Sequence, residues 1–387
     1  MSARAPDIPP HPDAATRAAD DAVRARARWA ALFALLALLL MHAVHLHKLG
    51  SGYIEQQWVI DYASGFLRRG LFGELYRHTR RDIGDVYTLF RILVILAYLA
   101  YAAVVWRQVI RTRPLEAYEI AILLLTPVGW AYLSKMNGRF DLLFDLVSVA
   151  VLSLRDPRWQ LGALLLAAVP LGLVHELWYV LYLPLLGFYF VSQGRLRSGV
   201  AALVLAAAAA AALSAATRDA PADISAVCSD LNAAFRALSL PENCSRWSLL
   251  TSTQTLRQAI DDALFRGQSP ALLPFLENLA EFLLTAGYIA AAALPLLWVL
   301  HGRFRVQRRF ATYFLPGLAL TLATCVIALD WGRFLVDFLF VSVAALLLGG
   351  DAVPREQAIP TRAPVKALLV ALTLALSNLP LTKIIVF

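Results

Sequence analysis

The chain has 387 residues, of which 59% are hydrophobic and 16% are charged. An average soluble domain has about 45–50% apolar and about 25% charged residues, so this composition excludes an ordinary soluble domain. The formal charge is +8, but the basic residues lie in short clusters between apolar runs. This distribution excludes the continuous basic face that nucleic acid requires, and it indicates a polytopic helical membrane protein.

The N-terminal segment, residues 1–27, is rich in Ala, Pro, Arg and Asp. We expect a disordered cytoplasmic tail, because such a segment cannot form an apolar core. It has neither the short apolar stretch nor the small-residue cleavage site of a signal peptide. The first apolar run, near Trp29, is therefore expected to remain in the protein.

Residues 28–387 are predicted to form one transmembrane domain. The fold class expected is an all-α polytopic membrane protein with about 11 transmembrane helices, each needing about 20 apolar residues. The predicted spans are 29–47, 86–106, 116–134, 140–154, 160–174, 177–192, 198–216, 279–300, 310–329, 334–349 and 366–384.

Basic residues predict the orientation of these spans. With a cytoplasmic N-terminus, every cytoplasmic loop contains Lys or Arg, for example Arg155 and Arg158 in one loop and Arg195 and Arg197 in the next. Most outer turns contain few, as the positive-inside rule requires. We therefore expect an integral protein of a bacterial inner membrane with its N-terminus in the cytoplasm.

Two predicted outer loops are long, residues 48–85 and 217–278. The second contains Cys228 and Cys244, whereas Cys325 lies in an apolar span. A disulfide between Cys228 and Cys244 fits an oxidising compartment and agrees with the orientation. Two unpaired thiols are the alternative.

Ionisable residues from four separate segments fall at the outer ends of the predicted spans. Charges at the bilayer edge are costly and usually point into a bundle or a wet cavity, so they are functional candidates. A helix-end anchor or a structural Arg–Asp pair is the alternative for any one of them. The set consists of Asp61, Arg68, Arg69, Arg139, Asp141, His175, Glu176, Asp330 and Arg333.

The chemistry of this set divides into two roles. Guanidinium groups bind phosphate bidentately, so the candidate substrate-binding residues are Arg68, Arg69, Arg139 and Arg333, together with His175. A carboxylate near an apolar boundary can act as a general base toward a hydroxyl, so the candidate catalytic residues are Asp61, Asp141, Glu176 and Asp330. Glycosyl transfer from a polyprenyl-linked donor uses both functions.

The first outer loop contains a membrane-surface segment, residues 61–76. In it, apolar side chains such as Phe66 and Leu71 alternate with Arg68 and Arg69. The pattern predicts an amphipathic helix lying in the interface, with its arginines at headgroup depth. It would bind a lipid-linked phosphate next to Asp61, or else serve only as a lipid-headgroup anchor.

The predicted spans and loops follow a recognisable order along the chain. The first span is followed directly by an outer loop with an acidic residue and an interfacial helix, and many spans with short outer turns come after it. The layout resembles the C-superfamily of membrane glycosyltransferases, the GT-C fold. The resemblance implies a polyprenyl-phosphate- or pyrophosphate-linked sugar donor, a lipid or glycan acceptor, and membrane lipids as neighbours. The family's first-loop acidic residue would correspond to Asp61, with Glu55 as the competing position. Some members use a divalent ion, so Mg²⁺ or Mn²⁺ at Asp61 or Asp141 is kept as an alternative to no cofactor.

Two other functions are kept open. The chain also resembles bacterial O-antigen and exopolysaccharide polymerases, which join lipid-linked oligosaccharide units and have large outer loops like 217–278. A transporter or flippase for an anionic lipid or glycan would also place Arg and Asp in a wet cavity. Residues 138–141 (Gly-Arg-Phe-Asp) are similar to residues 332–334 (Gly-Arg-Phe) with Asp337, and such a short repeat is what two related halves of a transporter would show.

Overall fold

A computed structural model describes residues 116–126, 140–218, 272–303, 308–327, 331–349 and 361–378, with isolated residues between 19 and 32, 71 and 78, and 229 and 236. The described part is helical and contains no strand. Three helical segments are long and apolar enough to cross a membrane, namely Pro157–Val174, Leu196–Leu213 and Phe275–His301. The all-helical class predicted from the sequence is confirmed for this part of the chain, and its apolar helices are consistent with a membrane protein.

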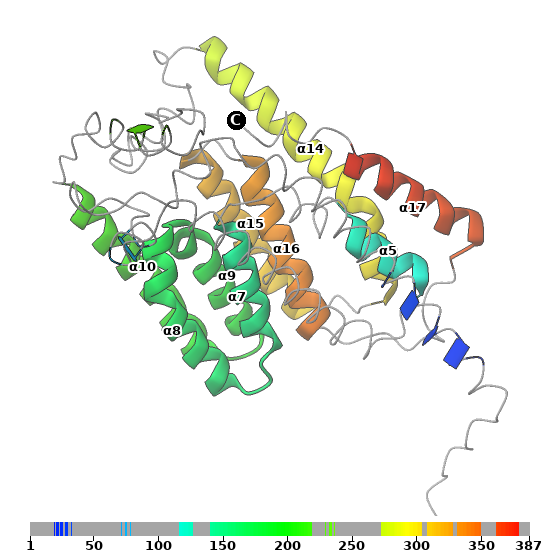
Figure 1. Ribbon diagram of the computed structural model, residues 1–387, viewed down its shortest axis with the longest axis horizontal. Helices are drawn as coiled ribbons and strands as arrows, with labels where there is room; N and C mark the ends of the chain where they lie inside the picture. Colours follow the sequence, from blue (N-terminus) through cyan, green and yellow to red (C-terminus); the bar gives the residue numbers. More distant parts are fainter. Residues whose placement is uncertain are drawn as a thin grey trace, which may run out of the picture.

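Each described helix falls on a predicted span (Figure 1). The helices are α5 (Ala117–Leu125), α7 (Asp141–Ser153), α8 (Pro157–Val174), the π-helix η2 (Trp178–Tyr182), α9 (Leu183–Ser192), α10 (Leu196–Arg218), α14 (Leu272–Arg303), α15 (Arg308–Ile327), α16 (Trp331–Gly349) and α17 (Ala363–Asn378).

Two helix bounds differ clearly from the prediction. Helix α14 begins at Leu272, inside the segment expected to be the long outer loop, because its polar residues interrupt the apolar run without interrupting the helix. Helix α5 ends at Leu125, since Thr126 has an extended backbone, as expected for a residue that precedes a proline.

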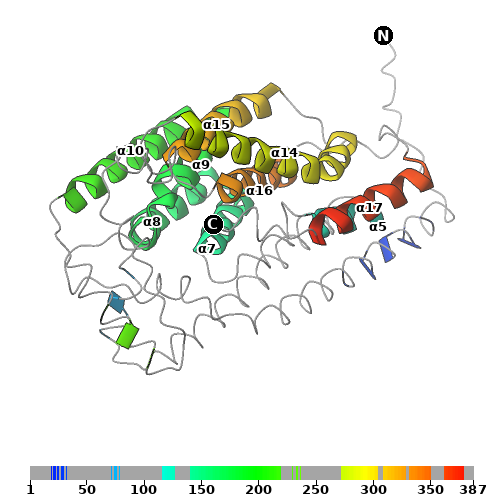
Figure 2. The same ribbon diagram turned by 90° about the horizontal axis from the view of Figure 1, so that it is seen from above.

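Six helical segments form the main bundle. Helix α9 packs against α10 and α15, α15 packs against α16, α16 against α7, and α7 against α8. The long helix α14 contacts α16 and also reaches α17 and α5, which lie together at one side (Figures 1 and 2). The bundle therefore places α16 next to α7, although these two helices are far apart in sequence.

Glycines allow the closest of these crossings. A Cβ on Gly199 of α10 would lie 2.4 Å from Val191 Cγ2 and 2.7 Å from the Gly187 carbonyl oxygen of α9. Small residues let two helix backbones approach in this way. Between the two helices, Gly194 turns the chain with a φ of 77°, which few other residues adopt.

The outward faces of the helices are apolar. Leu166 on α8, Leu284 on α14 and Leu315 on α15 are 80%, 74% and 64% exposed. A helix that is apolar on its exposed face as well as on its buried face is typical of a membrane span. These leucines fit contact with lipid.

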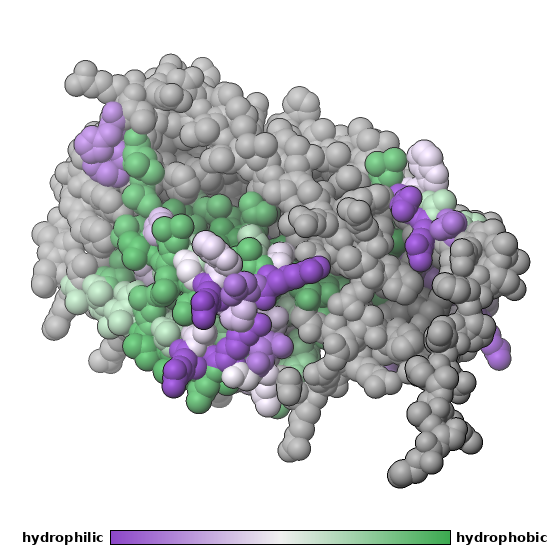
Figure 3. Space-filling view, turned by 90° about the horizontal axis from the view of Figure 1, so that it is seen from below, coloured by the Kyte–Doolittle hydropathy of each residue, from purple (hydrophilic) through white to green (hydrophobic). Residues whose placement is uncertain are grey.

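The end of the bundle where α7 joins α8 is polar, and we call it the Arg158 end. Gln160 donates a hydrogen bond to the Leu154 carbonyl oxygen at 2.7 Å and accepts one from Arg195, which joins the α7–α8 turn to the α9–α10 turn. Arg158 and Arg197 are exposed there. Seen from below, the molecule has a group of hydrophilic side chains bordered by hydrophobic ones (Figure 3).

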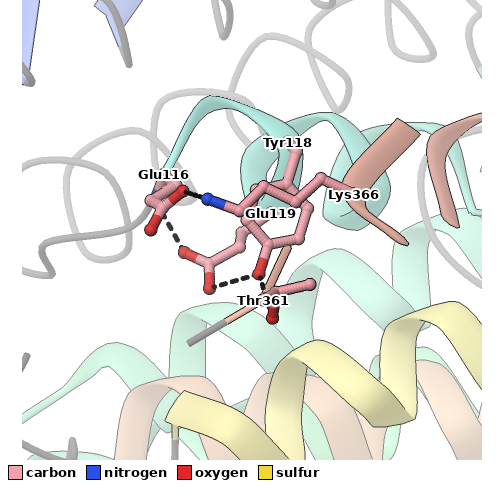
Figure 4. A network of polar contacts seen from close by, with 5 residues as sticks. All are labelled: Glu116, Tyr118, Glu119, Thr361 and Lys366. Carbon is pink, nitrogen blue, oxygen red and sulfur yellow. Dashed lines mark hydrogen bonds and ion pairs between the residues drawn. The ribbon is translucent and has the colours of Figure 1, made fainter. Parts of the chain in front are cut away.

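A separate polar network joins α5 to α17 (Figure 4). Lys366 forms an ion pair with Glu116, and its ammonium group lies 5.0 Å from the centroid of the Tyr118 ring. The Tyr118 hydroxyl is 3.3 Å from Glu119 Oε1 and 3.4 Å from Thr361 Oγ1. The network fixes the starts of the two helices through Glu116 and Lys366, which are 250 residues apart in sequence.

Candidate functional site

The candidate site lies at the opposite end of the bundle, which we call the Asp141 end. Helix α7 begins with Asp141 and has Asp145 one turn later, and α16 has Arg333 in its first turn and Asp337 one turn later. Residues four apart lie on the same face of a helix, and α7 packs against α16. All four residues are buried, with exposed fractions for the whole residue of 2% for Asp141, 1% for Asp145, 6% for Arg333 and 0% for Asp337.

An ion pair joins the two helices. Arg333 Nε lies 3.6 Å from Asp141 Oδ2, and the same guanidinium carbon is 5.0 Å from the centroid of the Phe334 ring. Removing two charges from water is costly, and the attraction between them offsets that cost only while both partners are present. The pair therefore fixes the N-terminal ends of α7 and α16 against each other.

The second turn of each helix adds negative charge. The Tyr182 hydroxyl of η2 donates a hydrogen bond to Asp145 Oδ1 at 3.0 Å, whereas Asp145 Oδ2 has no hydrogen-bond partner among the described residues. The charge of Asp145 interacts with those of Asp337 and Asp141. Three buried carboxyl groups, those of Asp141, Asp145 and Asp337, thus lie close enough for their charges to interact.

A third segment reaches this end between α8 and η2. Helix α8 ends at Val174 because His175 has an extended backbone. His175 Nδ1 accepts a hydrogen bond from the Leu177 backbone N–H at 3.1 Å, so the neutral ring carries its proton on Nε2. The ring packs against Phe140 and Phe144 of the α7 segment, with both pairs of ring centroids 6.3 Å apart.

Glu176 is the more accessible carboxylate at the Asp141 end. Its Oε2 lies 3.3 Å from His175 Nδ1, and its side chain is 21% exposed, whereas the side chain of Asp141 is 3% exposed. The π-helix η2 follows directly, and π-helical turns are frequent at functional sites. Aromatic packing of Trp178 and Tyr182 against Phe144 holds this segment on α7.

The structure brings four of the sequence-predicted residues to one end of the bundle: Asp141, His175, Glu176 and Arg333. Arg333 was expected in an outer turn, but α16 begins at Trp331, so its side chain is buried in the first helical turn. The other predicted residues lie outside the described part of the chain. These are Asp61, Arg68, Arg69, Arg139, Asp330 and the cysteines Cys228 and Cys244.

The sequence did not point to Asp145, and it pointed to Asp337 only as part of the short repeat shared by residues 138–141 and 332–337. The available signal was the four-residue spacing, since Asp145 follows Asp141 and Asp337 follows Arg333 at the interval that aligns side chains on one helical face.

Within the described ranges, no three His, Cys, Asp or Glu side chains are grouped so that they could hold a metal ion. Asp141, the described residue among the expected positions for a divalent ion, forms an ion pair with Arg333. Comparisons with models of protein families, with curated proteins and with solved structures find no match to this chain.

Proposed function

We propose that this chain is a membrane glycosyltransferase that acts at the periplasmic face in cell-envelope polysaccharide or glycolipid assembly. Its donor is a sugar linked to polyprenyl phosphate or pyrophosphate, and its acceptor is a lipid or glycan hydroxyl. The observation that supports the proposal is the gathering of Asp141, Arg333, His175 and Glu176 at one end of three helices. Membrane-embedded charges that converge in this way are functional candidates by default.

The reaction requires a cationic clamp and a base. The acceptor O–H bond breaks as its proton moves to a carboxylate, the acceptor oxygen bonds to the anomeric carbon, and the bond from that carbon to the phosphate oxygen breaks. The electron pair leaves with the phosphate, and guanidinium groups stabilise the anion that forms. Arg68, Arg69, Arg139 and Arg333 are the proposed clamp.

The described carboxylates divide into two proposed roles. Asp141 is paired with Arg333 and so acts as a positioning residue that orients the guanidinium. Glu176 is the described carboxylate best placed to accept a proton, because its side chain is 21% exposed at the same end. Asp61 and Asp330 remain proposed bases outside the described residues.

The test uses the full chain in lipid nanodiscs. The probe is a panel of monosaccharides linked to polyprenyl phosphate, with envelope lipid extract as the acceptor, and mass spectrometry measures released polyprenyl phosphate. We expect release above the protein-free background and a loss of about 10²–10⁴-fold in rate for the variant of the true base, Glu176→Gln or Asp61→Asn. Donor affinity should be nearly unchanged in that variant.

The matched control is Glu277→Gln, which removes an exposed carboxylate from α14 and should leave the rate unchanged. A rate near that of the parent chain in Glu176→Gln, Asp61→Asn, Asp141→Asn and Asp330→Asn alike would contradict the proposal.

Two other functions fit some of the same features. A polymerase of lipid-linked oligosaccharide units would use the same chemistry with a longer acceptor. A transporter or flippase for an anionic lipid or glycan is favoured by Asp145 and Asp337, which lie one turn beyond the ion pair and are 1% and 0% exposed. Movement of the lipid-linked probe across proteoliposomes without release of polyprenyl phosphate would select the transporter.

A further inference from the structure

The Arg158 end of the bundle gathers positive charge for which glycosyl transfer at the Asp141 end gives no role. Two turns meet there, the α7–α8 turn and the α9–α10 turn, and each brings two arginines. The four are Arg155, Arg158, Arg195 and Arg197. Arg155, Arg158 and Arg197 are exposed, so their charge acts on whatever surrounds this end of the molecule.

Among the described residues, little negative charge accompanies these arginines. Asp156 lies between Arg155 and Arg158, and its Oδ1 accepts a hydrogen bond from the Arg158 backbone N–H at 2.8 Å, which caps α8. Within the described ranges, no ion pair joins Arg155, Arg158 or Arg197 to a carboxylate. One carboxylate among four guanidinium groups leaves a net positive charge at this end, and such a patch attracts anions.

A buried glutamine holds the two turns together. Gln160 donates a hydrogen bond to the Leu154 carbonyl oxygen at 2.7 Å and accepts one from Arg195. This side chain therefore ties the start of α8 to the start of α10, where Arg158 and Arg197 lie. The arginines of two separate helices are kept at one end by bonds inside the protein.

Apolar side chains begin directly beside the exposed arginines. Trp159, which follows Arg158, is 71% exposed, and tryptophan is enriched where a membrane meets water. On α10 an exposed apolar stripe starts next to Arg197 and continues at four-residue spacing, which keeps it on one face of the helix. The stripe consists of Leu196, Val200 and Val204. Figure 3 shows hydrophilic side chains bordered by hydrophobic ones on the face seen from below.

We propose that the Arg158 end binds an anionic glycerophospholipid. Arg158 and Arg197 hold the phosphate of its headgroup, Trp159 lies at the level of the glycerol backbone, and the acyl chains follow the apolar stripe of α10. Guanidinium groups bind phosphate with charge-assisted hydrogen bonds, and basic residues at the ends of spans recognise anionic headgroups.

The apolar surroundings favour a lipid over a soluble anion. A soluble phosphate has the same headgroup chemistry, but it would leave exposed Trp159 and Leu196 without a partner of their own kind. The site is at the other end of the bundle from Asp141 and Arg333, so it does not depend on glycosyl transfer.

The test is native mass spectrometry of the purified full chain in a neutral detergent. The probes are dioleoyl phosphatidylglycerol, whose headgroup is anionic, and dioleoyl phosphatidylcholine, which has the same acyl chains and a headgroup without net charge. We expect the protein to retain phosphatidylglycerol at lower lipid concentrations than phosphatidylcholine. Retention of both lipids at equal concentrations would overturn the proposal.

Substitution of single arginines locates the site. Each basic residue near an anionic lipid surface contributes about fivefold to affinity, so Arg158→Gln and Arg197→Gln should each weaken phosphatidylglycerol binding by about fivefold and together by about 25-fold. The matched control is Arg362→Gln, which removes an exposed arginine directly before α17. All three side chains are exposed, so Tm in detergent should stay near that of the parent chain. Equal affinities in the double variant and in Arg362→Gln would contradict the assignment.

A competition arm separates the lipid from a soluble anion. Glycerophosphate has the phosphate of the lipid but no acyl chains, and an excess of it should leave phosphatidylglycerol bound. We also expect Trp159→Ala to weaken retention of phosphatidylglycerol, because the variant loses apolar contact beside the headgroup. Displacement of the lipid by glycerophosphate, with retention unaffected by Trp159→Ala, would assign the arginines to a soluble anion and overturn the lipid site.

Discussion

Arg333 is a buried cation paired with Asp141, and its loss should be poorly tolerated. Arg333→Met would leave Asp141 charged and unpaired, and breaking a buried pair on one side costs about 3–5 kcal/mol. We expect a corresponding fall in the free energy of unfolding, measured by reversible denaturation in mixed micelles.

The control for this prediction is Arg158→Met, which removes an exposed arginine from the other end of the bundle and should change stability by less than about 1 kcal/mol. The double variant Asp141→Leu with Arg333→Met removes both charges and should recover part of the loss. A double variant no more stable than Arg333→Met would show that the pair does not stabilise the bundle.

The sequence predicts the polar residues at the Asp141 end but not their partners. Asp141, His175, Glu176 and Arg333 could be selected because they are ionisable residues at the ends of apolar runs. The ion pair of Asp141 could not be predicted, since it depends on which helices become neighbours, and residues 154–330 separate α7 from α16. The hydrogen bond that His175 accepts from the Leu177 backbone N–H depends on the extended backbone of His175, which no sequence pattern indicated.

Helix α8 allows its packing to be tested within one helix, because one of its two glycines is tightly packed and the other faces open space. A Cβ on Gly172 would lie 1.9 Å from Cζ of Tyr179, whereas nothing lies within 4 Å of a Cβ on Gly162. We expect Gly172→Ala to lower Tm by several degrees, because overpacking a core costs about 1–3 kcal/mol.

The same change at Gly162 should be neutral or stabilising, since alanine is favoured over glycine inside a helix by about 1 kcal/mol. Tyr179→Ala removes the ring that Gly172→Ala would meet. The double variant of Gly172→Ala and Tyr179→Ala should therefore have the same Tm as Tyr179→Ala alone. Equal Tm values for Gly172→Ala and Gly162→Ala would contradict the close contact.

The helices themselves were largely predictable. Apolar runs between charged turns gave the positions of α8, α10 and α16 to within a few residues. The start of α14 was missed because Glu277 and nearby polar residues lower the local hydropathy, although they do not end the helix. Periodicity carries no signal for the π-helical turn of η2, because it arises from how Trp178 and Tyr182 pack against α7.

At the scale of the whole molecule, two pairs of connections predicted to share the cytoplasmic side do meet in the structure. The α7–α8 and α9–α10 turns are joined through Gln160 and Arg195, and the starts of α5 and α17 are joined through Glu116 and Lys366 (Figure 4). Each contact is what an alternating arrangement of spans requires. Which side of the membrane these ends face remains a prediction of the basic loop residues.

The orientation can be tested with single cysteines at exposed positions near opposite ends of the bundle. Glu277→Cys lies in the first turns of α14, on the side predicted to be outer, and Arg197→Cys lies at the start of α10, on the side predicted to be cytoplasmic. A membrane-impermeant maleimide should label Glu277→Cys in intact cells and Arg197→Cys only after permeabilisation. The background carries Cys228→Ser and Cys244→Ser, so that the one remaining native cysteine is Cys325, which is buried and poorly reactive. Labelling in the reverse order would place the Asp141 end in the cytoplasm, where polyprenyl-linked donors of periplasmic reactions are not presented, and would remove the basis for transfer at that end.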